Sequence, residues 1–273
     1  MAYNKPDKIV EITIENGVKK SKFPLSQSLI LGFQAGAFIA LGFLLYVRAT
    51  APLTGEAAGF SNLIGGSVFP IGLILTLLAG GELLTGNMMV LPLARYAKKI
   101  STKQLLFNWF IITISNFVGS IFIAYFFGHV VGLTETGPYL DKTVDVAGAK
   151  LQATFWQAFF SGIGCNYLVT AAVWLCYGAE DITGKVLGIW VPTMTFVAVG
   201  FQHVVANMFI IPAAIFAGHY TWMEYLHNFV PVFLGNMVGG SVFIAMAYWY
   251  AYKKKDVSSI SANEYPLASK KGA

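Results

Sequence analysis

Long runs of apolar residues alternate with short polar stretches along the chain. A helix needs about 20 apolar residues to cross a bilayer, and several runs exceed that length. Before them, residues 7–20 place Val10, Ile14 and Val18 on one face, which predicts an amphipathic helix that lies along the cytoplasmic surface or caps the bundle. The pattern predicts six spans, over about residues 25–50, 60–97, 104–131, 155–177, 187–216 and 225–252.

Spans 2 and 5 are interrupted near their middle by glycine and polar residues. The first interruption reads GGELLTGNMMVLPLA from Gly80 to Ala94, and the second reads GFQHVVANMFIIPAA from Gly200 to Ala214. Aligned without a gap, the two stretches share Gly, Asn, Met, Pro and Ala at positions 120 residues apart. Backbone at membrane depth leaves the helix only where protein or a watery cavity satisfies its polar groups. Two such breaks at equivalent positions predict a transport site.

The same offset of 120 residues relates Asn108 to Asn228 and Asn116 to Asn236, so the third and sixth spans also correspond. Each repeat holds three spans, an odd number, so the second repeat is predicted to be inverted relative to the first. We therefore expect an all-α polytopic membrane protein of two inverted three-helix repeats. The predicted parts are a cytoplasmic segment 1–24, a channel domain 25–253 with repeats about 25–132 and 153–253, and a cytoplasmic tail 254–273.

The composition supports the bilayer as a partner and gives no reason to expect nucleic acid. Hydrophobic residues make up 56% of the chain and charged residues only 11%, against roughly 25% charged in an average soluble domain. The net charge of +5 comes from lysines and arginines before span 1, after span 2 and after span 6. This distribution places both termini in the cytoplasm of a multi-pass protein of the cell membrane, with residues 134–150 as an outside loop.

His203 is the main candidate for chemistry, because an ionisable residue at membrane depth is a functional hypothesis by default. Its equivalent in the other break is Leu83, so the break itself does not require a histidine. In a site with little water the neutral imidazole is favoured until an anion arrives, after which it can donate a hydrogen bond or a proton. The alternative is a neutral histidine that only satisfies freed backbone.

Other polar residues of the breaks have two interpretations each. Thr85 either reaches the substrate or His203, or bonds back to its own helix. Asn87 and Asn207 are expected to cap the second half-helices or to bond the freed backbone, rather than contact the substrate. The positive dipole ends of those half-helices favour anions. Glu82 is expected to be buried and hydrogen-bonded, or turned towards a neighbouring subunit.

Three further residues outside the breaks, one lysine and two cysteines, could carry chemistry. Lys150, at the mouth of span 4, either attracts anions or is an interfacial lysine. Cys165 and Cys176 lie too far apart along one helix for a disulfide. The sequence has no metal-ligand spacing, no paired histidines for haem, no phosphate-binding loop and no nucleophile elbow. We therefore expect no enzyme activity, no metal and no cofactor.

Several pieces of the sequence resemble the formate/nitrite transporter family, over most of residues 20–253. They are LIGGSVFPIGLIL, GGELLTGN, GCNYLVTAAVW, GFQHVVANMFIIPAAIFAG and NFVPVFLGNMVGG. The resemblance implies an aquaporin-like fold, a homopentamer with one pore per subunit, and passage of small monovalent anions or their conjugate acids. The anions it implies are formate, nitrite and hydrosulfide, and sometimes acetate or lactate.

By resemblance, His203 is the central pore histidine and Thr85 the threonine of the first break. The remaining carried-over roles are Phe69 and Phe196 for the outer constriction, Leu73 and Leu83 for the inner one, Lys150 and Asn166 for the electrostatic access route, and Asn236 near the pore. Gln202 departs from the glutamate that many members carry, which questions any mechanism in which a carboxylate polarises His203. The doubled Asn-Pro-Ala signature of water channels is absent.

The function expected from these observations is a channel or facilitator for formate or a similar small monovalent anion, with His203 as proton donor so that the acid form crosses. Nitrite or hydrosulfide are the competing substrates, and anion passage guided by half-helix dipoles and Lys150 is the competing mechanism. From other classes, a membrane oxidoreductase subunit would need paired cofactor ligands within the spans, and a structural or receptor-like protein would not need matched helix breaks.

Overall fold

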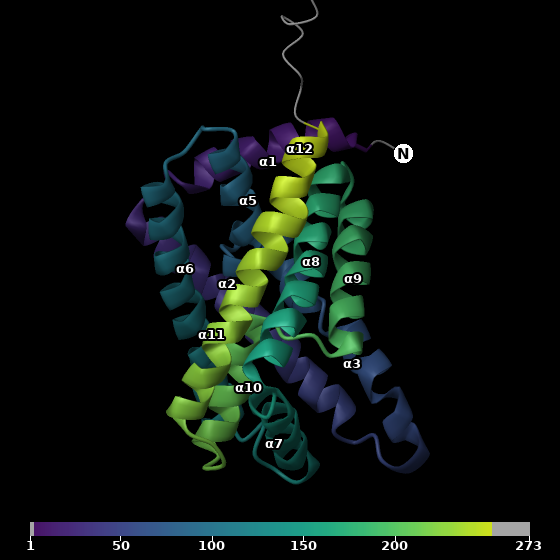
Figure 1. Cartoon of the computed structure of the whole chain (residues 1–273). Helices are drawn as coiled ribbons and strands as arrows, with labels where there is room; N and C mark the ends of the chain where they lie inside the picture. The colour runs from purple at the N-terminus through teal and green to yellow at the C-terminus, as the bar shows by residue number, and fades with distance from the viewer. Residues whose placement is uncertain (1–2, 253–273) are drawn as a thin grey trace, which may run out of the picture.

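The chain forms a bundle of membrane-length helices (Figure 1). The structure is a computed structural model that describes residues 3–252. Within this range, six helical stretches are long and apolar enough to cross a membrane: Leu25–Thr50, Gly55–Gly80, Thr102–Val130, Phe155–Gly178, Ile182–Val199 and Trp222–Tyr252. The predicted all-α polytopic membrane fold is confirmed. The predicted tail, residues 254–273, lies outside the described residues.

In the first half, a surface helix precedes three spans, of which the second is broken. The elements are α1 (Pro6–Lys20), α2 (Leu25–Thr50), η1 (Gly55–Phe60), α3 (Ser61–Val68), α4 (Ile71–Ile74), η2 (Leu75–Gly80), α5 (Leu84–Tyr96), α6 (Thr102–Phe122) and the π-helical η3 (Ile123–Val130). The second half has the same order of parts. Its elements are α7 (Pro138–Leu151), α8 (Phe155–Gly178), α9 (Ile182–Val199), α10 (Val204–Phe216), α11 (Trp222–Val238), the π-helical η4 (Gly239–Met246) and α12 (Ala247–Tyr252).

Each break follows a glycine with positive φ, Gly80 at 104° and Gly200 at 88°. Other residues avoid this conformation, because a Cβ clashes with the neighbouring carbonyl there. The helix therefore stops at each glycine, and the chain continues as the separate half-helices α5 and α10. The half-helix α5 packs against α1 and α10 packs against α7, and these two surface helices lie at opposite ends of the bundle (Figure 1). The inverted relation of the two halves stays a prediction.

Residues 138–151, expected as part of an outside loop, form the helix α7 instead. Pro138 occupies the first helical position, where its missing N–H and fixed φ suit a helix start. Asp141 in the first turn and Lys150 in the last complement the helix dipole. A narrow face with Thr143, Ala147 and Gly148 is buried, and the other positions mix apolar with charged residues. The charged residues interrupt each apolar run, which is why the sequence of this segment resembles a loop.

Reciprocal capping boxes fix the starts of three spans. The side chain of residue 101, 154 or 221 accepts from the backbone N–H three positions later, and that later side chain bonds back. Such boxes satisfy donors that a helix start otherwise leaves unpaired. The pairs are Ser101 with Gln104 in α6, Thr154 with Gln157 in α8, and Thr221 with Glu224 in α11.

The first described residues and the end of α12 lie at the same end of the bundle, beside α1 (Figure 1). The N–H of Asn4 donates to the carbonyl of Gly178 at 2.7 Å, so the segment before α1 is fixed to the end of α8. Both ends of the described part of the chain, residues 3 and 252, therefore lie on one side of the bundle. That this side is the cytoplasm stays a prediction.

Candidate functional site

The two breaks meet at one side-chain contact between Thr85 and His203. Thr85 Oγ1 lies 2.8 Å from His203 Nε2. Thr85 is the second residue of α5, and His203 directly precedes α10. Their exposed fractions are 0% and 2%, so solvent on the surface does not compete for this hydrogen bond. The starts of both half-helices therefore share one polar point in the interior.

The backbone fixes which nitrogen of His203 carries the proton. The N–H of Ala206 donates to His203 Nδ1 at 3.1 Å, so the imidazole acts as the N-cap of α10. A neutral imidazole whose Nδ1 accepts must carry its hydrogen on Nε2. Thr85 Oγ1 then accepts this hydrogen, and the hydroxyl hydrogen of Thr85 is available for a ligand. The pair presents a neutral donor, which suits an anion.

Asn116 of α6 holds the start of α5 from outside that helix. Its Oδ1 accepts from the N–H of Leu84 at 2.9 Å. Its Nδ2 donates at 2.8 Å to the carbonyls of Gly32 and Glu82. These three bonds satisfy backbone groups that the break frees in the interior, where an unpaired polar group is unfavourable.

Asn236 of α11 holds the start of α10 in the same way. Its Oδ1 accepts from the N–H of Val204 at 2.8 Å, and its Nδ2 donates to the carbonyls of Gly162 at 2.8 Å and Gln202 at 3.0 Å. Asn236 was predicted to lie near the pore. The structure places it behind the second break, with its side chain occupied by the backbone.

Asn87 and Asn207 have contacts that differ from the caps predicted for them. Asn87 Nδ2 donates to the side chains of Glu82 at 2.9 Å and Asn108 at 3.0 Å. Neither asparagine accepts from a half-helix N–H, and their Oδ1 atoms have no partner among the described residues. Both residues follow the first turn instead of preceding it, so their position excludes an N-cap.

Gln202 connects the second break to the end of α7. Its Oε1 accepts from Nδ2 of Asn207 and of Asn228, both at 2.9 Å. Its Nε2 donates to the carbonyl of Lys150 at 3.3 Å. At the equivalent place in the first break, Glu82 Oε1 forms an ion pair with Lys20 Nζ at 2.6 Å. The prediction that Glu82 is buried and hydrogen-bonded agrees with this geometry.

Apolar side chains close the space beside the histidine. The rings of Phe69 and Phe196 pack edge to face, with centroids 5.7 Å apart, and the Phe196 ring lies 5.8 Å from the imidazole. Leu73 lines the same narrow void, which has no room for a water molecule. Leu83 is buried at the start of α5 and does not line this void. Of the residues predicted for the two constrictions, the structure brings Phe69, Phe196 and Leu73 together.

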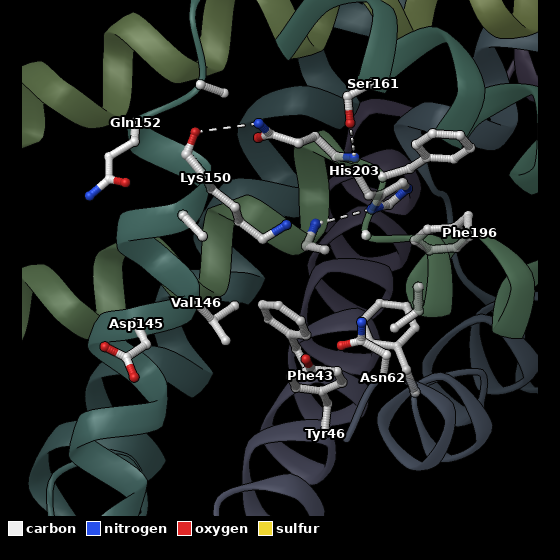
Figure 2. Close-up of a pocket in the computed structure, with 18 of the residues that line it drawn as sticks. Phe43, Tyr46, Asn62, Asp145, Val146, Lys150, Gln152, Ser161, Phe196 and His203 are labelled. Atoms are coloured by element: carbon white, nitrogen blue, oxygen red, sulfur yellow. Dashed lines mark hydrogen bonds between the residues drawn. The ribbon is translucent and has the colours of Figure 1, made fainter. Parts of the chain in front are cut away.

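A cavity of about 600 Å³ opens on the α7 side and reaches His203 (Figure 2). Lys150 extends into it, with Nζ 5.8 Å from the centre of the Phe43 ring. Burial lowers the pKa of the Lys150 ammonium to about 8. The cavity thus leads from a lysine to the aromatic pair and the imidazole.

Asn166 does not line this cavity, although an access route was predicted for it. Its Nδ2 donates to the carbonyls of Asn236 at 2.7 Å and Thr85 at 3.2 Å. Its Oδ1 has no partner among the described residues. The structure therefore places Asn166 behind Thr85, at the centre of the bundle.

Comparison with known proteins gives one family over nearly the whole chain. Residues 7–250 match the family described as formate/nitrite transporter. The chain belongs to the formate/nitrite transporter family. It is therefore a transporter and not an enzyme.

Relatives in this family are similar over almost their full length. An uncharacterized transporter, YrhG of Bacillus subtilis, is 58% identical over 94% of this chain and 97% of its own. The formate channel BtFdhC of Bacillus thuringiensis is 55% identical over 93% and 98%. The formate channel FocA of Haemophilus influenzae is 34% identical over 83% and 87%.

Solved structures from the family have the same fold. A channel described as an FNT family ion channel matches with a TM-score of 0.83 at 32% identity, over 89% of this chain and 98% of the other. A pentameric formate channel with formate bound matches with a TM-score of 0.74 at 33% identity, over 84% and 97%.

Sequence reasoning on this transporter did not identify Lys20 as part of a break, nor Asn108 and Asn228 as partners of the break asparagines. The signal for the asparagines is their offset of 120 residues. The signal for Lys20 is its distance of 130 residues from Lys150, the same offset that relates Gly32 to Gly162.

Proposed function

We propose that the chain is a channel that passes formate, or a similar small monovalent anion or its conjugate acid, across the cytoplasmic membrane. The observation that carries this proposal is the Thr85–His203 contact, where a neutral donor pair lies between two half-helix starts. Positive dipole ends at that point favour an anion. Relatives described as formate channels and a neighbour described with formate bound support formate among the possible anions.

The apolar rings beside the site make the charge of the substrate the main barrier. A charged group at the bilayer centre costs roughly 3 kcal/mol on insertion scales. The Phe69–Phe196 pair offers no hydrogen bond to replace the water that an anion loses. Formic acid carries no charge, so its passage avoids most of this cost. The acid form is therefore the species that crosses in our proposal.

His203 supplies the proton in this mechanism. The imidazolium hands one proton to formate, which becomes formic acid, and the ring returns to its neutral form. To become an imidazolium the ring must gain a hydrogen on Nδ1, which displaces the N–H of Ala206 from that atom. Proton delivery is thus coupled to loosening of the α10 cap.

His203→Asn tests the donor role while preserving the helix start. Asparagine is a good N-cap and can accept from the Ala206 N–H, but it does not titrate. In proteoliposomes with a formate gradient, we expect wild-type uptake to rise as the outside is acidified, and the variant to lose that rise. Unchanged acid stimulation in the variant would overturn the donor role and favour anion passage guided by the half-helix dipoles and Lys150.

Substrate identity is tested in the same vesicles. We expect formate to enter faster than nitrite or hydrosulfide at equal concentration and pH. A higher rate for nitrite or hydrosulfide would show that this anion, and not formate, is the substrate of the same mechanism. No flux of any of the three would overturn the channel function itself.

We also propose a homopentamer with one pore in each subunit. The support is the neighbour described as a pentameric formate channel, which covers 84% of this chain. Each chain already contains both breaks and its own cavity, so a subunit needs no partner residue to complete the site. Native mass spectrometry of the detergent-purified protein tests this, and a monomer would contradict it.

A further inference from the structure

The two surface helices end in equivalent lysines. Lys20 is the last residue of α1, and Lys150 is the last but one of α7. They are 130 residues apart, as are Thr13 and Thr143, which bond back to the carbonyl four residues earlier in each helix. Each lysine contacts the residue two positions after the glycine of a break. The two breaks have different residues at this position, Glu82 at the α1 end and Gln202 at the α7 end.

At the α1 end the lysine is fixed through its charge. Lys20 Nζ lies 2.6 Å from Glu82 Oε1, with side-chain exposed fractions of 16% and 5%. The other carboxylate oxygen accepts from Asn87. Because the ammonium and the carboxylate are in direct contact, their charges cancel for an anion in the pore.

At the α7 end the lysine is fixed through its backbone. The carbonyl of Lys150 accepts from Gln202 Nε2 at 3.3 Å and from Asn228 Nδ2 at 2.9 Å. The neutral amide of Gln202 thus holds the end of α7, as the carboxylate of Glu82 holds the end of α1. Unlike the carboxylate, it leaves the ammonium of Lys150 without a counter-ion. Among the ion pairs of the described residues, none involves Lys150. Figure 2 shows its side chain extending into the cavity towards Phe43 and away from Gln152.

Other charged groups do not remove this difference. Lys142 and Asp145 also line the cavity, and their opposite charges add no net charge. Exposed lysines at the α1 end lie in solvent, where salt screens charges beyond about 10 Å. Within the described residues they are Lys5, Lys8, Lys19, Lys22, Lys98, Lys99 and Lys103.

We infer that Gln202 makes the two mouths of the pore electrically unequal. The α7 mouth carries the uncompensated charge of Lys150 and concentrates anions, whereas the paired charges of Lys20 and Glu82 leave the α1 mouth without this attraction. The inference rests on the proposed passage of a small anion and adds which face captures it and which residue decides this.

The unequal charge of the two mouths predicts a specific difference in the kinetics of flux from the two faces. A passive channel without a voltage or pH difference must have the same permeability in both directions at low substrate. The extra charge therefore changes the half-saturating concentration at its own face. One unit charge about 4 Å from the anion in a water-like medium changes that concentration about five-fold.

The experiment measures formate flux from each face of the full-length channel. Membrane vesicles of both orientations are prepared, and cleavage of an N-terminal tag reports which face is outside. Voltage is clamped, pH is equal on both sides, and salt is at least 0.15 M. We expect the half-saturating concentration to be about five-fold lower at the α7 face in the wild type.

Two opposite charge changes test the assignment to Gln202. Gln202→Glu places a carboxylate beside Lys150 and should raise the half-saturating concentration at the α7 face about five-fold. Glu82→Gln frees Lys20 and should lower the value at the α1 face by a similar factor. Gln27→Glu, the same chemical change at an exposed position of α2, is the control and should change neither value.

Equal half-saturating concentrations at the two faces of the wild type would overturn the inference. So would a folded Gln202→Glu channel with an unchanged value at the α7 face. If Gln202→Glu does not assemble, Glu82→Gln decides alone, because an unchanged value at the α1 face contradicts the role of the ion pair. Absence of formate flux from both faces of the wild type overturns the proposed function instead.

Discussion

Thr85 and His203 lie 118 positions apart in the chain and meet at 2.8 Å in the interior of the bundle. The contact is possible because each residue lies at the start of a half-helix, where the chain has left the preceding helix. Since Ala206 occupies Nδ1 of the imidazole, the Thr85 hydroxyl is left as the free donor of the pair. The hydrogen bond from the Ala206 N–H on α10 thus determines that the Thr85 hydroxyl on α5 is free to donate.

This free donor predicts that Thr85 contributes to formate uptake through its hydroxyl. Thr85→Val removes the donor at nearly constant shape, and Thr85→Ser keeps it. A hydrogen bond to a charged group contributes about 1.5–3 kcal/mol, so the valine variant should lose at least ten-fold in formate uptake at low concentration. The serine variant should stay near wild type. Initial rates in proteoliposomes measure both, and wild-type uptake by Thr85→Val would show that the hydroxyl only packs.

The cap formed by His203 has a consequence for stability that is separate from transport. His203→Ala leaves the Ala206 N–H without its acceptor and should lower the free energy of unfolding by about 1 kcal/mol. His203→Asn should recover most of that loss, because asparagine caps well. Thermal unfolding in detergent compares the two. Equal losses in both variants would mean that the imidazole stabilises the site by packing alone.

The spans and the positions of the breaks were predictable from local sequence. Apolar runs set the spans, and Gly80 and Gly200 mark the points at which φ becomes positive. The shared Asn-Met-Pro pattern indicated that the two breaks are equivalent, and the histidine stood out because it is ionisable within an apolar run. These signals are read from short stretches or from the comparison of two such stretches, so no knowledge of packing is needed to find them.

The partners of each break were not predictable in the same way. Asn116 and Asn236 satisfy N–H groups 32 residues away in the chain, and this pairing depends on how the spans cross. Local propensity favoured Asn87 and Asn207 as caps, but in the structure the side chains of Asn116 and Asn236 accept from the N–H groups at the half-helix starts. The helix α7 was missed because charged residues interrupt its apolar positions, so the segment has no long apolar run.

The tertiary caps predict strong sensitivity at Asn116. Asn116→Ala leaves the N–H of Leu84 and two carbonyls unpaired in the interior, and each buried unpaired group costs about 1–3 kcal/mol. We expect a loss of about 3 kcal/mol or more in the free energy of unfolding. Ser115→Ala is the neighbouring control, since that hydroxyl only bonds back to the carbonyl of Ile111. Unfolding in detergent measures both, and equal small losses would contradict the capping role.

The charge of Lys150 predicts how capture at the α7 face depends on pH. Burial lowers the pKa of Lys150 to about 8, so the ammonium is charged below that pH and loses its charge as the pH rises through it. The half-saturating concentration for formate at this face should therefore rise about five-fold between pH 7 and pH 9.5.

Lys150→Arg separates this effect from other titrations, because a guanidinium stays charged throughout that range. Any change in the supply of formic acid, or in the state of His203, affects the wild type and the arginine variant alike. The half-saturating concentration of the wild type divided by that of the arginine variant isolates the effect of the lysine. This ratio should increase with pH, with a midpoint near pH 8. A constant ratio would show that the ammonium does not capture the anion, since loss of its charge would then have no effect on saturation at the face where it lies.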